Sequence, residues 1–383
     1  MKKFLAMLLI LVLVLAPLAA CTSEPPVDPP DDPTDTEDPA PTPEPPEDDE
    51  VPFIAVISKG FQHQFWQTVY AGARDAAAQY GVDITFEGPP TESDIHIQVD
   101  MVNAALARRP AAIALASLCT ESLDRQLTQA RDAGIPVIGF DSGVPDAPAG
   151  SIFSTAATDN YGAGALAADE MFAEPSFAER LNAATADAPI AIAIQSQDAT
   201  SASILDRTNG FINRMFELAS GVHPGAVEVS GHTVFNRDAE ETPAVQILVT
   251  IPPTTSAVDS HAASQAILQN TPNLIGMFLS NEASVGGVLA ATNDGTDLDR
   301  ETGIFSDLIV VGFDSGSLQK HAVRSQFFYG SVTQDPYMIG FLAVQLAVRA
   351  INGEPLEEFV DTGAKFWTHA NMDDPAIYQL LYD

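Results

Sequence analysis

Short apolar runs alternate with segments of helical spacing through most of this chain, and this rhythm constrains its fold more than any other feature. The run 53–57 is continuously apolar, as in a strand buried on both faces, and Gly81 is placed to cap the helix-like segment that follows it. A βαβα order with short loops predicts a doubly wound parallel sheet. We expect strands at 53–57, 82–86, 111–116, 136–140 and 151–157, and helices at 65–80, 94–109 and 122–133.

The rhythm begins again after Asp159, which predicts a second parallel sheet. Asn160 is a suitable N-cap for the first helix of this half. A longer excursion at 223–242 contains Val227, Val229 and Val234, which are compatible with an extra hairpin. We expect strands at 190–194, 245–250, 274–279 and 308–313, and helices at 160–172, 203–219, 257–269 and 285–292.

One segment of the first half recurs in the second: residues 135–143 (IPVIGFDSG) and 308–316 (LIVVGFDSG). Each copy is a predicted strand that delivers an aspartate, Asp141 or Asp314, at its carboxyl end. Ligands of open α/β sheets bind at the carboxyl ends of the strands. The repeat therefore indicates two lobes that face one another across a cleft. Unrelated strands of common composition are the alternative, which the repeated Asp-Ser-Gly disfavours.

The first 50 residues differ in composition from the rest. A basic start and the apolar run 4–15 are typical of a cleavable signal rather than a membrane span. The sequence Leu18-Ala-Ala-Cys21 resembles a bacterial lipobox, which implies cleavage before Cys21 and a diacylglyceryl anchor on it. Residues 22–50 contain ten Pro and twelve Asp or Glu but no Lys or Arg, so they cannot bury apolar surface. We expect a signal peptide at 1–20 and a lipid-anchored, disordered stalk at 21–50.

The overall composition excludes several kinds of site. With 52 acidic and 17 basic residues the net charge is −35, which argues against nucleic acid as a partner. Two cysteines cannot form a disulfide framework or a four-Cys zinc site, and the seven His lack ligand spacing, so we expect no metal or other cofactor. Cys119 is interpreted as a reduced, partly buried thiol. Gly162 and Gly164 imitate a dinucleotide fingerprint, but they fall inside a helical pattern.

Residues 51–383 resemble the type I periplasmic binding proteins, in the sugar-binding branch with the ribose and galactose receptors. The motifs that carry this resemblance are Phe65-Trp66, Ile135 to Asp141, Asn281-Glu282, Val311 to Asp314, Thr333 to Pro336, and the tail from Asp361 to Asn371. The resemblance implies an α/β fold with two Rossmann-like lobes, whose parallel sheets are joined by a three-strand hinge near Ala157, Gln334 and Phe366. The implied N-terminal lobe comprises 51–157 plus 335–366, and the C-terminal lobe 158–334 plus 367–383.

The family binds a monosaccharide between its lobes, with aromatic rings on the sugar face and polar groups on the hydroxyls. Carried over to this sequence, the resemblance implies ligand contacts by Phe65, Trp66, His63, Asp141, Arg207, Asn281, Asp314 and Gln334, with Lys59 as a further candidate. His63 stands where ribose receptors have Asn, and Ser142 stands where an Arg often follows the first aspartate.

Some of these residues have a simpler alternative role. Lys59 fits a solvated strand end equally well, Arg207 fits a surface ion pair, and one of the two adjacent aromatic residues fits the core. The family's further aromatic residue of the second lobe falls near Thr254 by spacing, so this stacking partner is either missing here or supplied by Phe235.

These features predict the capture component of an ABC importer for a monosaccharide or similar small polyol. We expect an exported, lipid-anchored monomer whose partners are the sugar and a membrane permease. A sensory receptor that presents the sugar to a membrane signalling protein shares every site residue. An extracellular carbohydrate-active enzyme is the third alternative, and it requires two carboxylates at glycosidase spacing.

Overall fold

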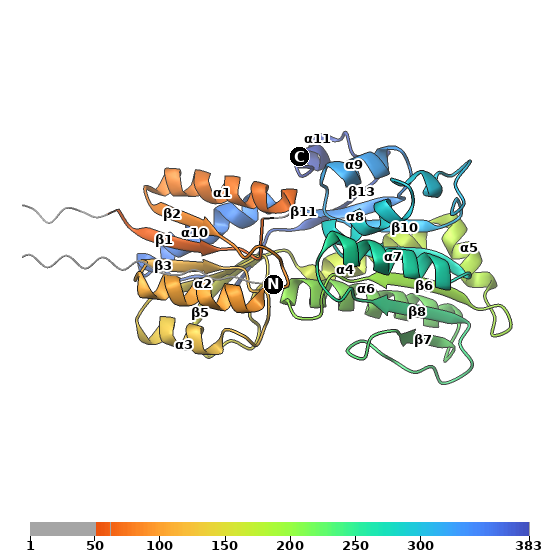
Figure 1. Ribbon diagram of the computed structural model, residues 1–383, viewed down its shortest axis with the longest axis horizontal. Helices are drawn as coiled ribbons and strands as arrows, with labels where there is room; N and C mark the ends of the chain where they lie inside the picture. The colour runs from red at the N-terminus through yellow and green to blue at the C-terminus, as the bar shows by residue number, and fades with distance from the viewer. Residues whose placement is uncertain (1–50, 62, 383) are drawn as a thin grey trace, which may run out of the picture. The chain divides into compact units, whose positions relative to one another are not determined.

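Two sheets organise the part of the chain that the computed structural model describes, residues 51–61 and 63–382 (Figure 1). The first has the strand order β12-β5-β4-β3-β1-β2, with every neighbouring pair parallel. Its strands are β1 (Phe53–Ile57), β2 (Asp83–Glu87), β3 (Ala112–Leu115), β4 (Val137–Phe140), β5 (Ile152–Ala157) and β12 (Phe359–Asp361). The parallel sheet predicted for the first half is therefore confirmed.

The second sheet has the order β13-β11-β10-β9-β6-β8-β7. Its pairs are parallel except that the edge strand β13 runs antiparallel to β11. Its strands are β6 (Ile190–Gln195), β7 (Val227–Ser230), β8 (Val245–Thr250), β9 (Leu274–Leu279), β10 (Ile309–Phe313), β11 (Gly330–Gln334) and β13 (Ala364–Trp367). The chain thus forms two α/β lobes, as the sequence predicts.

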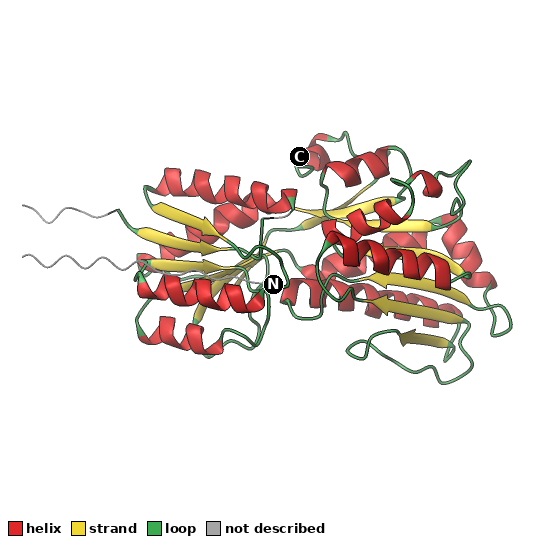
Figure 2. Ribbon diagram, viewed as in Figure 1, coloured by secondary structure: helices red, strands yellow, loops and turns green. Residues whose placement is uncertain are grey.

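Helices cover both faces of each sheet (Figure 2). The first lobe has α1 (Gln64–Tyr80), α2 (Ile95–Ala107), α3 (Asp124–Asp132) and α10 (Pro336–Ile351). The second has α4 (Asn160–Ala173), α5 (Pro175–Ala183), α6 (Ala202–Val222), α7 (Ala257–Asn270), α8 (Glu282–Ala291), α9 (Ser317–Arg324), α11 (Pro375–Tyr378) and a 3-10 turn at Thr296–Leu298. Four apolar clusters fill the spaces between helices and sheets, one on each face of each sheet.

A pair of helices in each lobe approaches so closely that glycine is required at the contact. A Cβ at Gly164 of α4 would lie 2.0 Å from the carbonyl oxygen of Arg207 in α6, and one at Gly210 would lie 2.0 Å from that of Tyr161. In the first lobe, Gly340 of α10 meets α1 in the same way. The glycines that imitate a nucleotide motif therefore include one that serves helix packing, and this packing fixes the backbone that carries Arg207.

The chain passes between the lobes three times. It crosses after β5 at 158–159, after β11 at residue 335, and between β12 and β13 at 362–363. The first two crossings lie beside Ala157 and Gln334, as expected. The third comes earlier than the expected Phe366, because residues 364–367 already pair with β11 in the second sheet.

Two local expectations were wrong. The N-cap of α4 is Asp159, whose side chain accepts a hydrogen bond from the Gly162 amide, while Asn160 is the first helical residue. The excursion at 223–242 does not form two paired strands: β7 pairs in parallel with β8 at the sheet edge, Val229 and Arg237 form a single antiparallel bridge, and Val234 is exposed. Periodicity alone cannot distinguish a hairpin from an added edge strand, since both alternate buried and exposed residues.

Candidate ligand-binding site

A cavity of about 20 Å³ lies between the two lobes, and all nine residues proposed from the sequence line it. These residues are Lys59, His63, Phe65, Trp66, Asp141, Arg207, Asn281, Asp314 and Gln334. Three further residues line it that sequence reasoning did not select: Glu92, Ile204 and Glu282. A cavity needs a volume of roughly 10–15 Å³ to hold one water molecule. The lobes are therefore closed to a spacing that a sugar-sized ligand must widen.

Asp141 and Asp314, the two residues of the internal repeat, hold equivalent positions. Each follows the last residue of a central strand, β4 or β10, and each has a left-handed backbone, with φ of 56° and 81°. Each amide donates to a carbonyl of the neighbouring strand, at Ala156 and Val332. This shared backbone turns both carboxylates toward the cavity, where each side chain is 4% exposed.

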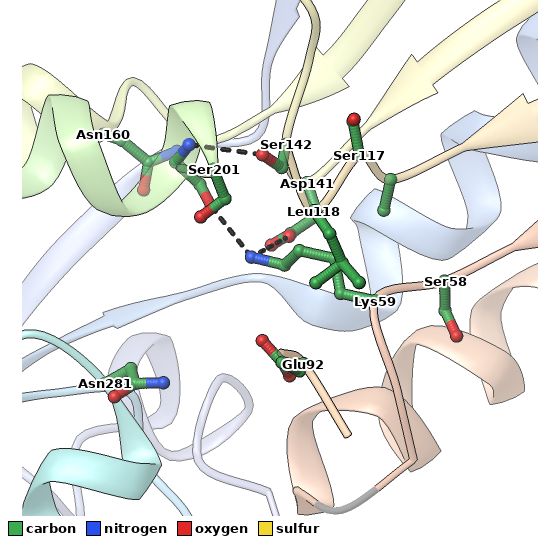
Figure 3. A network of polar contacts seen from close by, with 12 residues as sticks. Ser58, Lys59, Glu92, Ser117, Leu118, Asp141, Ser142, Asn160, Ser201 and Asn281 are labelled. Atoms are coloured by element: carbon green, nitrogen blue, oxygen red, sulfur yellow. Dashed lines mark hydrogen bonds and ion pairs between the residues drawn. The ribbon is translucent and has the colours of Figure 1, made fainter. Parts of the chain in front are cut away.

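Lys59 is buried and paired rather than solvated. Its ammonium lies 3.1 Å from the Asp141 carboxylate (Figure 3). It also donates to Ser203 of α6 in the other lobe, at 3.0 Å. Burial opposes the charge, but Asp141, Glu92 and Asp198 outweigh it, so the pKa of Lys59 is raised above its usual value. Lys59 thus stays charged and joins the lobes at the cavity wall.

Arg207 is held from three sides and does not belong to a surface ion pair. Its guanidinium donates to the side-chain oxygen of Asn160 at 2.7 and 3.2 Å and to the Ser280 carbonyl at 2.6 Å. It also stacks on the ring of Phe313, 3.4 Å from the ring centroid. Burial lowers its pKa, and the carboxylates of Asp314 and Asp141 act against this. Asn160, misread as a cap, instead orients this guanidinium.

The aromatic pair Phe65 and Trp66 contributes to both the cavity and the core. The rings are nearly perpendicular, at 87° with centroids 5.0 Å apart, and the side chains are 6% and 1% exposed. Both belong to the apolar cluster beneath α1, and both line the cavity. From the sequence, one of the two rings is expected to belong to the core and the other to the cleft. Both rings do both, because the start of α1 lies where the core reaches the cavity.

Glu92 is the most consequential residue that the sequence reasoning missed. It accepts hydrogen bonds from the Trp66 indole at 2.8 Å and from Gln197 of the second lobe at 2.9 Å, and His63 lies 3.7 Å away. Burial alone would raise its pKa, but Lys59, His63 and these hydrogen bonds outweigh it and lower the value. Its position in the loop after β2 was a usable signal, since polar residues there lie at the ligand edge of the sheet.

On the second lobe, Asp314 accepts hydrogen bonds from Gln334 at 2.8 Å and from the Glu282 amide at 3.2 Å. Gln334 also accepts from Thr158, at 2.9 Å. Two of the three chain crossings are thus connected to Asp314 by side chains. Asn281 caps α8 through Ser284 and donates to Gln197, so its amide is already engaged on both sides.

Neither Phe235 nor Thr254 lines the cavity on the side of the second lobe. Phe235 is buried in the core beside His232, and Thr254 is bonded to Asp259 at the surface. Ile204 supplies the apolar wall on that side. A larger cavity of about 530 Å³ lies near loop 143–150, and Asp141 is the residue that it shares with the predicted set.

Two other kinds of feature are absent from the described ranges. Between 51 and 382, apart from residue 62, no three His, Cys, Asp or Glu side chains are grouped as a metal site requires. In the same part of the chain, no helix has the length and apolar character needed to cross a membrane. Cys119 is a free, partly buried thiol, as expected. Cys21, the signal and the stalk lie outside the described residues.

Comparison with known proteins places this geometry in a family. A model of the periplasmic binding protein domain matches residues 54–355. The D-allose-binding periplasmic protein of Escherichia coli K12 is 22% identical over 300 residues, which cover 77% of this chain and 83% of the relative.

Solved structures agree with this match. One from Brachyspira murdochii, described as an ABC transporter and LacI family transcriptional regulator, is 39% identical, with a TM-score of 0.71 and 87% and 99% of the two chains covered. An ABC transporter solute-binding protein from Agrobacterium vitis with bound D-fucose is 26% identical, with a TM-score of 0.71 and coverage of 86% and 100%. One from Agrobacterium radiobacter in complex with D-arabinose is 27% identical, with a TM-score of 0.70 and coverage of 87% and 99%.

These relatives are described as binding and transport proteins, which places the chain among binding proteins rather than enzymes. The fold matches along nearly the full length of the solved chains. The chain therefore belongs to the periplasmic binding protein family and has the type I fold of its sugar-binding members.

Proposed function

We propose that this protein captures a monosaccharide or a similarly small polyol between its lobes and delivers it to an ABC permease. One observation carries the proposal: two aromatic rings, cationic hydrogen-bond donors and anionic hydrogen-bond acceptors all line the same buried cavity. Relatives with 26% and 27% identity hold D-fucose and D-arabinose, and a third is named for D-allose.

The chemistry of the cavity suits a sugar. Hydroxyls both donate and accept, so they match Asp141 and Asp314 as acceptors and Lys59 and Arg207 as donors. A buried polar group left without a partner costs about 1–3 kcal/mol, so a mixed lining favours a ligand with hydroxyls around its rim. The apolar faces of a sugar ring fit the aromatic pair at the start of α1.

Binding requires the ligand-free protein to exchange between this closed state and an open state, because a ligand can enter only when the lobes separate. The closed cavity of about 20 Å³ is much smaller than the roughly 300–1,000 Å³ of typical ligand pockets. The three crossings are the places where the backbone can absorb such a movement. The ligand then favours the closed state through contacts that both lobes supply at once.

We further propose that the protein is exported and that Cys21 carries its membrane anchor, with residues 22–50 as a stalk. Proline-rich chains extend by about 3.1 Å per residue, so this stalk could reach on the order of 90 Å from a membrane. The folded part, whose two lobes are joined by the crossings at 158–159, 335 and 362–363, would then act as a tethered monomer beside its permease.

A thermal-shift screen of pentoses, hexoses, polyols and nucleosides tests the proposed ligand class. A ligand at 100 times its dissociation constant adds about 2.7 kcal/mol to stability, which raises the melting temperature measurably. Small-angle scattering of the best hit should then show a smaller radius of gyration with ligand than without it. A screen without any stabilising sugar or polyol would contradict the proposed function, and an unchanged profile at saturation would contradict closure.

A further inference from the structure

Two helices that face the cleft lack a side-chain cap of their own, and each is capped from the opposite lobe. Helix α1 of the first lobe has His63 as its N-cap residue, with no side-chain cap bond. The amide of Phe65 in its first turn donates instead to the carboxylate of Glu282, at 3.2 Å. Glu282 is the first residue of α8 in the second lobe.

The reverse contact lies beside it. Helix α9 of the second lobe follows Gly316, which offers no side chain for capping. Its first amide, on Ser317, donates at 2.7 Å to the side-chain oxygen of Gln64 in the first lobe. The Gln64 amide group in turn donates to the Ser317 hydroxyl at 3.0 Å. Unbonded amides at a helix start are normally satisfied by a nearby side chain of the same segment or by water.

We infer that Gln64 and Glu282 are positioning residues of the ligand site, which hold the two lobes closed by each capping a helix of the other lobe. This inference rests on the proposed function, because closure matters only if a ligand is trapped by it. Neither cap can survive separation of the lobes, since each joins residues from opposite sides of the cleft. The pair therefore acts as a latch, and we use that name for these two residues with Phe65 and Ser317.

The location of the latch agrees with this role. Glu282 and His63 line the buried ligand cavity and also a second cavity of about 300 Å³, which Gln64, Gly316 and Ser317 line as well. The latch thus stands between the ligand cavity and a larger space beside it. Opening the latch joins the two spaces, which gives a ligand a route into and out of the site.

The charges around Glu282 make the latch sensitive to pH. Asp314 faces it from the end of β10, His63 from the start of α1, and Tyr382 from the C-terminal segment. The cavity also contains Lys59, Arg207, Glu92 and Asp141. Burial, together with the charge of Asp314, raises the pKa of Glu282 to about 7. A protonated carboxyl still has an oxygen that accepts from the Phe65 amide.

The sign of this dependence follows from linkage. Opening exposes Glu282 to water, so its pKa falls back toward the usual value of 4.5, and the closed state holds the proton more tightly than the open state. The contribution of Glu282 to closure is therefore fully present below about pH 4.5, and it is lost as the pH rises through about 7. Ligand dissociation should be slower in mild acid than above neutrality.

The test measures dissociation constants and dissociation rates of the full-length protein, with the best sugar from the screen, between pH 5 and 8. Loss of a helix cap corresponds to about a two- to thirtyfold change in an equilibrium constant. We expect Gln64→Ala and Glu282→Ala to weaken binding by this factor, mainly through faster dissociation. Glu282→Gln keeps the acceptor without the charge, so it should bind more tightly than wild type at pH 8 and show a flatter pH profile.

The matched controls are Gln67→Ala, an exposed glutamine of α1, and Glu179→Ala, an exposed glutamate of α5. Equal dissociation rates for Glu282→Ala, Gln64→Ala and these controls would overturn the latch, as would an unchanged pH profile in Glu282→Gln. Wild-type protein that binds no sugar would instead contradict the proposed function. In that case, small-angle scattering of the ligand-free Gln64→Ala/Glu282→Ala protein decides, because a latch predicts a larger radius of gyration than in wild type and an equal one overturns it.

Discussion

Asp141 and Asp314 lie at matching positions of the two lobes, each directly after a central strand and each in the left-handed backbone region. Non-glycine residues seldom adopt this conformation, and Asp is among those that tolerate it best. The repeated Asp-Ser-Gly sequence is thus accompanied by a repeated backbone geometry. The partners of the two side chains differ, since Lys59 contacts the first carboxylate, and Gln334 with the Glu282 amide contacts the second.

Replacing Asp314 with Ala should weaken sugar binding strongly. Removal of a buried charged partner typically costs about 2–5 kcal/mol of affinity. Because the side chain also satisfies Gln334 and the Glu282 amide, we expect a further loss of about 1–3 kcal/mol in the free energy of unfolding. Isothermal titration and urea denaturation measure the two effects, with the exposed Asp238→Ala as control. Wild-type affinity in Asp314→Ala would place the binding site elsewhere.

Replacing Lys59 with Met should destabilise the fold even without a ligand. The Asp141 carboxylate would then be buried without its cation, and breaking a buried pair in this way costs about 3–5 kcal/mol. The double variant Lys59→Met/Asp141→Asn removes the stranded charge, so it should recover part of this loss. Urea denaturation of the two variants measures the difference. A double variant less stable than Lys59→Met would show that the pair does not govern stability here.

Glu92 should make stability depend on pH in the acid range. The pKa of this carboxyl is lowered below its usual value of 4.5 in the folded protein. Its stabilising contribution is therefore fully present above about pH 4.5 and is lost as the pH falls through the lowered pKa. We expect the free energy of unfolding of Glu92→Gln to fall less steeply between pH 5 and 3 than that of wild type. Parallel curves would rule out this contribution.

Replacing Gly210 with Ala should disturb the packing of α4 on α6. The added methyl would meet the Tyr161 carbonyl at 2.0 Å, and overpacking of this kind costs about 1–3 kcal/mol. Gly221 lies near the end of the same helix and has no atom within 4 Å of such a methyl. Gly221→Ala should therefore be neutral or stabilising by about 0.5–1 kcal/mol. Melting temperatures of the two variants check this, and equal values would contradict the close approach.

Replacing Cys21 with Ser should release the protein from the membrane. The proposed anchor is a thioether lipid, which serine cannot accept in this form, and a lipid chain contributes about 0.8 kcal/mol per buried CH₂. Fractionation of cells into membrane and soluble parts measures the outcome. Retention of the variant in the membrane fraction would contradict the lipoprotein assignment.

The central strands and most helices could be predicted because both sheets are covered on both faces, which leaves continuous apolar runs that are easy to recognise. The expected ranges did not include β11, β12, β13, α5, α9 and α10. The prediction of a hairpin at 223–242 was wrong because an edge strand and a hairpin arm show the same alternation of buried and exposed residues. Asn160 was taken for a cap because Asp159 and Asn160 are both good capping residues, and only the tertiary position of Arg207 distinguishes them.

The cavity residues could be predicted where they follow strands or match family motifs. Glu92 was missed because it follows a partly exposed strand, in a loop where a carboxylate is ordinarily solvated. Glu282 was noticed only as part of a motif. Its contact with Phe65 joins segments that are far apart in the chain, and no local pattern reports such a contact.

The three crossings also affect how the chain can fold. Helix α10 covers the same face of the first sheet as α1, and β12 forms an edge of that sheet, yet both are made only after β6 to β11 of the second lobe. The first lobe cannot complete its core while the polypeptide is still being synthesised. Pairing over such sequence separations slows folding. The first lobe therefore stays incompletely folded until the C-terminal segment is available, and the export proposed above would act on a chain that has not yet closed its first core.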